Sequence, residues 1–321
     1  MSETGPLFVS SGDLVSDRRY KAAVELAARG DLVAAADILA QTVEVAPDFA
    51  TAWFALGAIR DRLADRAGAV AAFDNASRAD PDDYHGARLQ LARLGATEKA
   101  PAMTESYLRR LFDQYAARYD VALTEHLHYR GPALLRVAVE SALHRLKRAL
   151  HFASMMDLGC GTGLAGAVFR PFVERLVGVD LSPAMIARAE TKKIYDRLAV
   201  GNLGNFLTSE IANQKTHDLV LAADVFVYVN ELDPILTNIA RALTPAGIVA
   251  FTVETHADDG VELLPTLRFA HGEPYLRDVI AAAGLNLLSL ERADIRTEKS
   301  MPVAGLVIVA AANDRGMAEG Q

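Results

Sequence analysis

Downstream of residue 151, short apolar runs alternate with longer amphipathic segments. The apolar runs are rich in Val, Leu and Ala and are bounded by Gly, Asp or Pro, which is typical of buried strands. Strands are expected at 153–157, 175–180, 198–201, 219–223, 247–253, 285–293 and 305–311. Helices are expected at about 105–117, 131–149 and 183–192, the first with Thr104 as N-cap and Glu105 in its first turn. This alternation predicts a mostly parallel sheet with helices on both faces.

The first hundred residues have a different pattern, which is helical, rich in alanine and repeated after 34 residues. The residues paired at this offset are Asp31 with Asp65, Ala35 with Ala69, Leu39 with Phe73 and Pro47 with Pro81. Small residues let two helices approach closely, and proline ends the second helix of each pair. We therefore expect helical hairpins at 18–50 and 52–83, with a further helix at about 83–94 as a cap.

This repeat resembles the tetratricopeptide (TPR) pattern, although its first copy is degenerate, with Arg19 opposite Trp53. The alternative is an alanine-rich pair of hairpins with no repeat relationship. Two repeats are fewer than the roughly three usually needed for stability. We therefore expect the module to pack on the second domain or on another subunit, as in a homodimer. The expected organisation is a flexible tail at 1–17, TPR-like repeats at 18–95, a linker at 96–104 and a second domain at 105–321.

The composition narrows the choice of function. The chain has 321 residues, a net charge of −8 and one cysteine. The negative charge argues against a general nucleic-acid or anionic-membrane binder, which would need a basic face. No Cys/His cluster has zinc spacing, so no metal site is predicted. The N-terminus lacks the basic start and apolar core of a secretion signal, no run approaches the ~20 apolar residues of a membrane span, and a cytoplasmic location is expected.

Residues 155–164 read MMDLGCGTGL, a glycine-rich stretch between a predicted strand and a predicted helix. Glycines there let the backbone approach a ligand closely. Asp180 ends the second strand, 19 residues after Gly161, where an acid can accept both hydroxyls of a ribose. The dinucleotide fingerprint G-x-G-x-x-G does not fit, because position 164 is Leu and because Asp157 stands where that strand end is normally apolar.

The stretch resembles motif I of the class I S-adenosylmethionine-dependent methyltransferases, D-x-G-C/S-G-T-G. Residues 180–185, DLSPAM, resemble the next motif of that family, D-x-S-x-x-M. The resemblance covers about 104–312 and implies a Rossmann-like α/β fold, with a seven-stranded sheet whose last strand is antiparallel. It also implies S-adenosylmethionine as the cofactor. The whole chain is similar to bacterial predicted methyltransferases that contain N-terminal TPR repeats.

The family resemblance assigns roles to the residues that match its motifs. Asp157 would orient the loop or the cofactor's amino group, Gly159 and Gly161 would line the methionine part, and Asp180 would bind the ribose. Further cofactor contacts are implied for Cys160, Gly163, Leu181, Met185, Leu203 and Asp224. Asn202 stands where the family usually has an aspartate that accepts from the adenine amino group. Its oxygen can still accept, but without the charge, so weaker binding is expected.

Residues 111–120, LFDQYAARYD, resemble the segment F-D-x-x-A-x-x-Y-D of small-molecule methyltransferases, which folds over the cofactor. We call residues 111–120 the lid segment. Tyr115 and Tyr119 are four residues apart, so on a helix they share a face, and both are expected at the cofactor. The alternative is an amphipathic helix with two core tyrosines.

The acceptor site is expected around the ends of the fourth and fifth strands and in the segment that follows. Catalytic roles are expected for His271, Tyr228 and Glu254, and substrate contacts for Arg268, Tyr228, Tyr275 and Arg296. An unperturbed histidine has a pKa near 6.5, which suits a base at neutral pH. The alternative for His271 is a surface-loop histidine. Arg268 would bind a substrate carboxylate or else be a solvated charge.

Three functions remain open from the sequence. The first is methylation of a small polar metabolite on O, N or S. The second is protein methylation, with the TPR module docking the substrate. The third is a non-catalytic scaffold that binds the cofactor. Nucleic-acid methylation is disfavoured, because the fourth strand ends in DVFV at 224–227 rather than in an N/D-P-P-Y/F motif, and because the single cysteine lies in the glycine loop.

Overall fold

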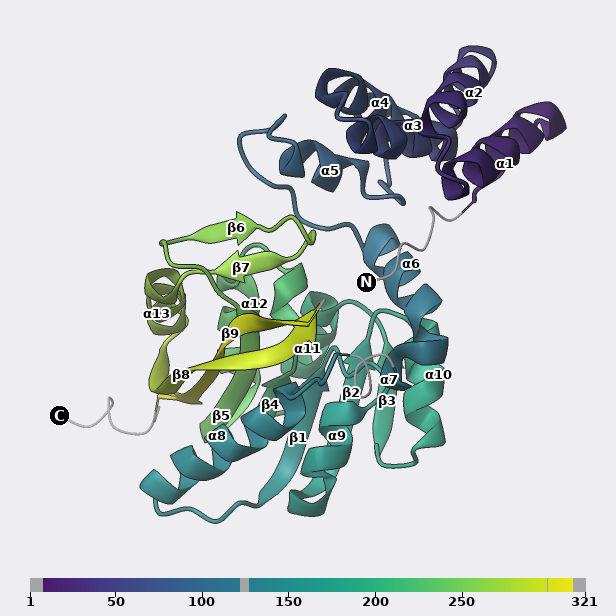
Figure 1. The fold of residues 1–321 in the computed structure, drawn as a ribbon. Coiled ribbons are helices and arrows are strands. Elements are labelled where there is room, and N and C mark those ends of the chain that lie inside the picture. Colours follow the sequence, from purple (N-terminus) through teal and green to yellow (C-terminus); the bar gives the residue numbers. More distant parts are fainter. Residues whose placement is uncertain (1–7, 122–126, 299, 314–321) are drawn as a thin grey trace. The chain divides into compact units, whose positions relative to one another are not determined.

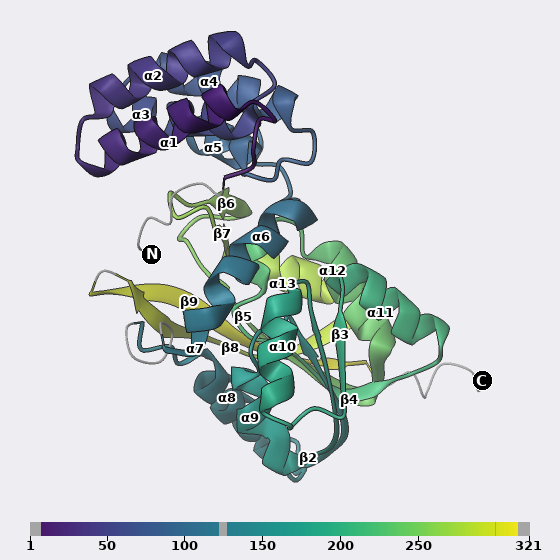
Figure 2. The same ribbon diagram turned by 90° about the vertical axis from the view of Figure 1, so that its right-hand side faces the viewer.

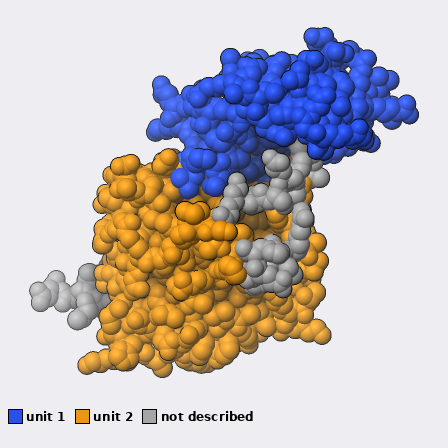
Figure 3. All heavy atoms as spheres, viewed as in Figure 1, with its two compact units in different colours: residues 1–107, 263–267 blue, residues 108–262, 268–321 orange. Residues whose placement is uncertain are grey.

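The computed structural model describes residues 8–121, 127–298 and 300–313. The chain divides into two compact units (Figure 3). Unit 1 comprises residues 1–107 and 263–267, and unit 2 comprises residues 108–262 and 268–321. The expected domain boundaries at 17, 95 and 104 stay predictions. The expected flexible tail falls in part on residues 1–7, which lie outside the described residues.

The described part of unit 1 is mainly helical (Figure 1). Its helices are α1 (Leu14–Ala28), α2 (Leu32–Val45), α3 (Ala50–Arg62), α4 (Arg66–Ala79) and α5 (Ala87–Arg93). Helices α2 and α4 start and end 34 positions apart. Each follows an aspartate N-cap: Asp31 accepts the N–H of Ala34 at 3.1 Å, and Asp65 accepts that of Gly68 at 2.9 Å. The predicted period therefore appears in the backbone, whereas the TPR assignment itself stays a prediction.

Small residues allow the helices of unit 1 to pack closely. A Cβ added to Gly57 of α3 would lie 2.8 Å from the ring of Phe73 of α4, so the two helices can pack at this distance only with glycine there. Helix α5 begins at Ala87, later than the expected 83, because Asp83 and Gly86 adopt positive φ angles of 51° and 78°. These angles form a turn and are incompatible with a helix.

Helix α6 (Glu105–Tyr115) begins where the sequence predicted. The hydroxyl of Thr104 accepts the N–H of Tyr107 at 3.2 Å, which confirms the N-cap. The expected helix to residue 117 is interrupted, because residues Ala116–Arg118 tighten into a 3-10 turn, η1, before the short helix α7 (Tyr119–Val121). The premise that Tyr115 and Tyr119 share one face of an α-helix is therefore wrong, since a 3-10 turn advances by a different angle per residue.

Unit 2 contains a sheet whose central strands are parallel (Figure 1). The strands are β1 (Phe152–Leu158), β2 (Val173–Asp180), β3 (Arg197–Val200), β4 (His217–Ala222), β5 (Leu243–Glu254), β6 (Val261–Leu263), β7 (Phe269–His271), β8 (Leu285–Glu298) and β9 (Met301–Ala312). The central order is β3-β2-β1-β4-β5, and β9 pairs antiparallel with both β5 and β8. All seven predicted strands are present, and the last is antiparallel as expected. The short strands β6 and β7 were not predicted.

Helices cover both faces of this sheet (Figure 2). The helices are α8 (Gly131–Arg145), α9 (Leu164–Phe169), α10 (Pro183–Thr191), α11 (Leu203–Ala212), α12 (Asp233–Ala242) and α13 (Glu273–Ala282). Residues of α8 and α9 share one buried cluster with the sheet, and residues of α11, α12 and α13 share the other. Helix α8 stops at Arg145 rather than at 149, because Lys147 adopts a positive φ of 56°. No helix in the described part of the chain is both long and apolar enough to span a membrane.

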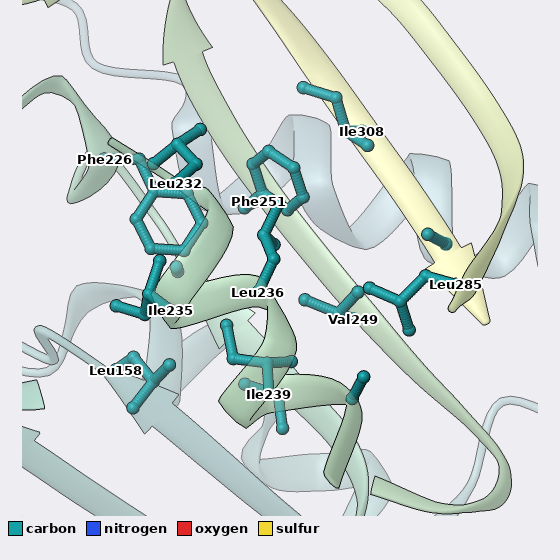
Figure 4. Packing of buried hydrophobic residues seen from close by; sticks show 14 of the residues in the cluster. Leu158, Phe226, Leu232, Ile235, Leu236, Ile239, Val249, Phe251, Leu285 and Ile308 are labelled. Carbon is teal, nitrogen blue, oxygen red and sulfur yellow. The ribbon is translucent and has the colours of Figure 1, made fainter. Parts of the chain in front are cut away.

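One buried cluster fixes the segment that follows β4. Phe226 begins the 3-10 turn η4 (Phe226–Tyr228) and is fully buried. Its ring centroid lies 5.0 Å from that of Phe251 of β5, and Leu232 and Leu236 pack beside the two rings (Figure 4). The backbone at 224–228 is thus anchored to the sheet by its own apolar side chains.

Candidate functional site

The glycine loop joins β1 to α9 and turns sharply at each of its glycines. Gly159, Gly161 and Gly163 have φ angles of 63°, 52° and 90°. A Cβ on Gly159 would lie 2.6 Å from Val225, so this position admits no side chain. The N–H of Cys160 donates to the carbonyl of Val179 at 3.0 Å, which ties the loop to β2. The loop backbone is therefore exposed to a ligand without Cβ atoms at its closest points.

Asp180 holds this loop and the start of α10 together. One carboxylate oxygen accepts the N–H of Gly161 at 2.9 Å, and the other accepts the N–H of Ser182 at 2.9 Å. Burial raises the pKa of Asp180 to about 6, in spite of these hydrogen bonds. Each oxygen keeps a lone pair, so the carboxylate can still accept from the hydroxyls of a ribose.

Asp157, at the end of β1, is also buried. It accepts a hydrogen bond from the hydroxyl of Tyr195 at 2.7 Å, and burial raises its pKa to about 7. The Tyr195 ring also lies 3.0 Å from where a Cβ on Gly163 would stand, so this tyrosine supports both the carboxylate and the loop. Sequence reasoning missed Tyr195, because it lies 38 residues from Asp157 in a segment without a motif.

Two aspartates fasten the lid segment, one to the start of α10 and the other to the glycine loop. Asp113 accepts from the hydroxyl of Ser182 at 2.5 Å and from the N–H of Ala184 at 3.4 Å. Asp120 accepts from the hydroxyl of Thr162 and pairs with Lys192 at 2.9 Å. The two acids of the F-D-x-x-A-x-x-Y-D pattern thus bind the two motifs that the sequence analysis singled out, although neither acid was itself predicted as a site residue.

A hollow opens between the glycine loop and the lid segment. Its lining residues are Tyr119, Tyr129, Pro132, Asp157, Gly159, Cys160, Gly161, Thr162, Leu164, Ala165 and Ala223. A Cβ on Gly161 would lie 3.8 Å from the Tyr119 ring, so this tyrosine lies over the loop. Tyr115 is not among the lining residues. Burial raises the pKa of Cys160 well above its ordinary value, so its thiol stays protonated.

The predicted adenine side is less complete. Met185 is fully buried, whereas Leu181 and Leu203 are partly exposed. The side-chain oxygen of Asn202 accepts the N–H groups of Gly204 and Asn205 at 2.8 and 3.2 Å, as the N-cap of α11. Both lone pairs of this oxygen are therefore engaged, and it cannot also accept from an adenine amino group while the cap is intact. The expected role of Asn202 needs this correction.

Five charged residues form a network at the ends of β4, β5 and β8 and before β7. Arg268 pairs with Glu254 and, at 2.7 Å, with Glu298. Arg296 pairs with Glu254, with Glu298 at 3.1 Å and with Asp224 at 2.6 Å. Both guanidinium groups are buried. The expectation of a solvated Arg268 is therefore wrong, and neither arginine offers an unoccupied guanidinium to a substrate carboxylate.

Asp224 links this network to the hollow. Its neighbour Ala223 lines the hollow, and its other neighbour, Val225, packs over Gly159. Its backbone N–H donates to Thr252 at 2.9 Å, and its φ is 61°, a conformation uncommon for any residue other than glycine. Uncommon backbone conformations of this kind cluster at functional sites.

His271 lies in β7 and is fully buried, so the surface-loop alternative is wrong. Its Nε2 donates to the carbonyl of Val229 at 3.0 Å, and burial lowers its pKa to about 4. An unperturbed pKa near 6.5 is therefore also wrong. Its ring stacks on Tyr275, with centroids 5.9 Å apart, and the Tyr275 hydroxyl accepts the N–H of Leu232 at 2.9 Å. These contacts hold the segment after η4.

Tyr228, the last residue of η4, packs against the lid segment. Its ring meets that of Phe112 edge to face, with centroids 5.1 Å apart. The structure therefore brings Tyr228, Asp224 and Tyr119 close to the glycine loop. His271 and Tyr275 instead hold the residues that follow η4. Within the described residues, no group of three His, Cys, Asp or Glu side chains is placed to hold a metal ion.

A family model described as "Methyltransferase domain" matches residues 156–251. The chain contains a class I methyltransferase domain. This domain is of the S-adenosylmethionine-dependent kind, and the matched span includes the glycine loop, Asp180 and Asp224. Its residues fit that cofactor, because the glycine loop leaves space that side chains would fill and because two buried carboxylates border it.

Curated relatives match part of this chain. Methyltransferase-like protein 27 from Homo sapiens is 35% identical over 114 residues, which are 35% of this chain and 44% of that protein. A ubiquinone biosynthesis O-methyltransferase from Rhodopseudomonas palustris is 28% identical over 129 residues, which are 38% of this chain and 51% of that protein. The chain spans about half the length of the curated relatives it matches.

A search of solved structures also returned the N-methyltransferase NodS from Bradyrhizobium japonicum in complex with S-adenosylhomocysteine. It aligns with a TM-score of 0.49 at 17% identity and covers 64% of this chain and 97% of that chain.

Proposed function

We propose that this protein transfers a methyl group from S-adenosylmethionine to a small polar molecule. The observation that carries the proposal is the position of Asp180, a buried carboxylate at the carboxyl end of β2 that also binds the backbone of Gly161. An acid at this strand end, beside a glycine-rich loop, suits the ribose of a nucleoside cofactor. The printed name of the Rhodopseudomonas palustris relatives, a ubiquinone biosynthesis O-methyltransferase, supports a small-molecule acceptor.

Residues in the hollow and on the neighbouring strand end and helix have proposed parts in this reaction. Asp157, Gly159 and Gly161 hold the methionine part of the cofactor, Asp180 holds the ribose, and Met185 packs near the adenine. The bound cofactor supplies a methyl group activated by a positively charged sulfur. Transfer of that methyl needs an acceptor atom aligned with the carbon–sulfur bond and needs water to be excluded.

The contacts of the lid segment support the proposal that water is excluded from the site. Asp113 and Asp120 fasten it to Ser182 and Thr162, on the two motif loops that flank the cofactor position. Tyr119 lies over Gly161 and is itself buried enough that its pKa is well above the ordinary value. His271 acts in this proposal as a positioning residue, because its Nε2 holds Val229 just after Tyr228.

A second candidate, methylation of a protein docked on unit 1, has one supporting observation. A hollow within unit 1 is lined by acidic residues together with aromatic and polar ones, among them Asp48, Asp80, Asp82, Tyr84 and His85. A basic peptide segment would suit this charge. The third candidate is a scaffold that binds the cofactor without transferring its methyl group. The test below distinguishes it from the other two.

The test is calorimetric titration of the full chain with S-adenosylmethionine and S-adenosylhomocysteine, followed by the Asp180→Asn variant. Both ligands should bind the wild type. Asp180→Asn should weaken binding about 100-fold, because charge-assisted hydrogen bonds to the ribose contribute roughly 1.5–3 kcal/mol each. Glu190→Gln, which removes an exposed acid from α10, is the matched control and should bind like the wild type.

The outcomes separate the three candidates. Binding by Asp180→Asn that equals the wild type would show that the cofactor assignment is wrong. Cofactor binding with methyl transfer to a protein, but to no small molecule, would favour the second candidate. Cofactor binding without any transfer would favour the scaffold.

A further inference from the structure

The network that includes Asp224 carries a surplus of negative charge. It contains three carboxylates (Asp224, Glu254 and Glu298) and two guanidinium groups, so its formal charge is −1. Glu254 and Glu298 each bridge both arginines. A substrate carboxylate could reach an arginine only by displacing one of these buried partners, and an unpaired buried charge costs several kcal/mol. The network therefore disfavours an anionic acceptor.

Asp224 is the member of the network whose chain neighbours reach the cofactor loop. Its side chain is 13% exposed, against 3% for Arg296 and 16% for Glu298. Its Oδ1 pairs with Arg296, and its Oδ2 accepts no hydrogen bond from the described residues. Its neighbours Ala223 and Val225 belong to the hollow and to the packing over Gly159. A carboxylate oxygen that accepts no hydrogen bond from the described residues thus lies in the segment that borders the hollow.

Most groups around this position are poorly suited to removing a proton from a hydroxyl, and Asp157 is engaged by the hydroxyl of Tyr195. His271 donates from Nε2 to Val229, and burial lowers its pKa to about 4, so its Nδ1 is a weak base. Glu254 and Glu298 are engaged by the two arginines. Burial raises the pKa values of Tyr119 and Tyr129 well above the ordinary range, so neither is a phenolate base at neutral pH. An alcohol needs such a base in the transition state, whereas an ammonium ion can lose its proton to water before the reaction, and the neutral amine then attacks with its lone pair.

We infer that the acceptor is a primary or secondary amine, held by a hydrogen bond from its nitrogen to the outward oxygen of Asp224. The inference rests on the proposed function. The nitrogen lone pair forms a new N–C bond, the C–S bond of the donor breaks, and its electron pair stays on sulfur. The nitrogen then bears the positive charge that the sulfur had, and one N–H proton passes to water. The surplus negative charge stabilises the ammonium that develops.

The experiment uses the full chain, S-adenosylmethionine labelled with carbon-13 in its methyl group, and probes in matched sets. One set is phenethylamine, 2-phenylethanol and 3-phenylpropanoate, and a second is butylamine, butanol and butanoate. Tyramine offers an amine and a phenol in one molecule. The methyl carbon-13 chemical shift tells N-methyl from O-methyl products, and calorimetry on the protein loaded with S-adenosylhomocysteine measures probe binding without turnover. We expect the amines to bind and to give N-methyl products, and tyramine to be methylated on nitrogen.

Variants test the role of Asp224. Asp224→Asn should raise KM for phenethylamine about tenfold or more, the usual effect of losing a charge-assisted hydrogen bond. Glu298→Gln, which brings the network charge to zero, should also raise KM for phenethylamine. It replaces Asp224→Asn in the test if that variant does not fold. Glu231→Gln removes an exposed acid from the same loop and should leave KM unchanged.

Each contrary result has a distinct meaning. Preferential O-methylation of the alcohols or carboxylates would overturn the amine inference and leave the proposed function standing. An unchanged KM in both Asp224→Asn and Glu298→Gln would also overturn it. Failure of the wild type to bind S-adenosylhomocysteine would remove the proposed function and the inference together.

Discussion

The carboxylate of Asp113 accepts a hydrogen bond from the hydroxyl of Ser182 at 2.5 Å, across 69 positions of sequence. Ser182 is at the same time the N-cap of α10 and the neighbour of Leu181 and Asp180. This single contact therefore joins the lid segment to the strand end that we assign to the ribose. It makes closure of the lid and the shape of the cofactor site mutually dependent.

Breaking this contact should loosen the lid without unfolding the sheet. Asp113→Ala should speed release of S-adenosylhomocysteine about threefold to tenfold, since one such hydrogen bond contributes roughly 1 kcal/mol. Stopped-flow release and hydrogen exchange of residues 108–121 measure the effect. Ser182→Ala completes a double-mutant cycle, which separates the contact from the capping role of Ser182. Strict additivity of the two changes would contradict the coupling.

The buried acids predict a pH dependence of cofactor binding. Burial raises the pKa of Asp157 to about 7 and that of Asp180 to about 6, so at pH 5 both are largely protonated in the ligand-free protein. Because binding favours the ionised forms, affinity for S-adenosylhomocysteine should rise between about pH 5 and pH 8 and then level off. Calorimetry in two buffers of different ionisation enthalpy should detect proton release at pH 6. Asp157→Asn should remove the upper part of this dependence, and a flat profile in the wild type would contradict it.

His271 predicts an acid-sensitive fold. Burial lowers its native pKa to about 4, below the value of about 6.5 expected when the chain is unfolded. Between these values the unfolded chain binds a proton that the native protein does not, so stability falls as pH falls from about 6.5 towards 4. His271→Gln should lose less stability between pH 7 and 5 than the wild type, by about 2 kcal/mol. Urea unfolding at both pH values checks this, with the exposed His151→Gln as control.

The equivalent caps of α2 and α4 predict equivalent energetic effects. Asp31→Ala and Asp65→Ala should each destabilise their helix by about 1 kcal/mol, because each removes the side-chain acceptor for a backbone N–H of the first turn. Hydrogen exchange of α2 and α4 amides in the full chain measures the two effects separately. Asp37→Ala, an exposed change in the middle of α2, should not destabilise. Effects confined to one of the two caps would argue against a true structural repeat.

Local sequence signals predicted most of the fold. Thr104 could be identified as a cap because it precedes an apolar-periodic run, and Asp157 and Asp180 could be placed at strand ends because strands and glycines bracket them. The helix ends at Tyr115 and Arg145 could not be predicted, because the breaks depend on a 3-10 turn and on a positive φ at Lys147. No glycine or proline marks either position.

The acceptor side was harder to predict, since its contacts are distant in sequence. Arg268 and Arg296 could be recognised as charged residues near the sheet edge, but their carboxylate partners come from three separate strands or strand ends. The burial of His271 depends on β7, a three-residue strand too short to leave an apolar pattern. Both cases depend on tertiary pairing, which residue spacing does not reveal.

The two shared carboxylates also constrain how the proposed acceptor specificity of this protein can diverge. Because Glu254 and Glu298 each pair with two guanidinium groups, exchanging any one of these four residues for a neutral one removes at least two buried ion pairs at once. Among the three carboxylates of this network, Asp224 has a single arginine partner. Selection for new acceptors in the laboratory should therefore begin with changes at Asp224, while changes deeper in the network should arise as compensated pairs.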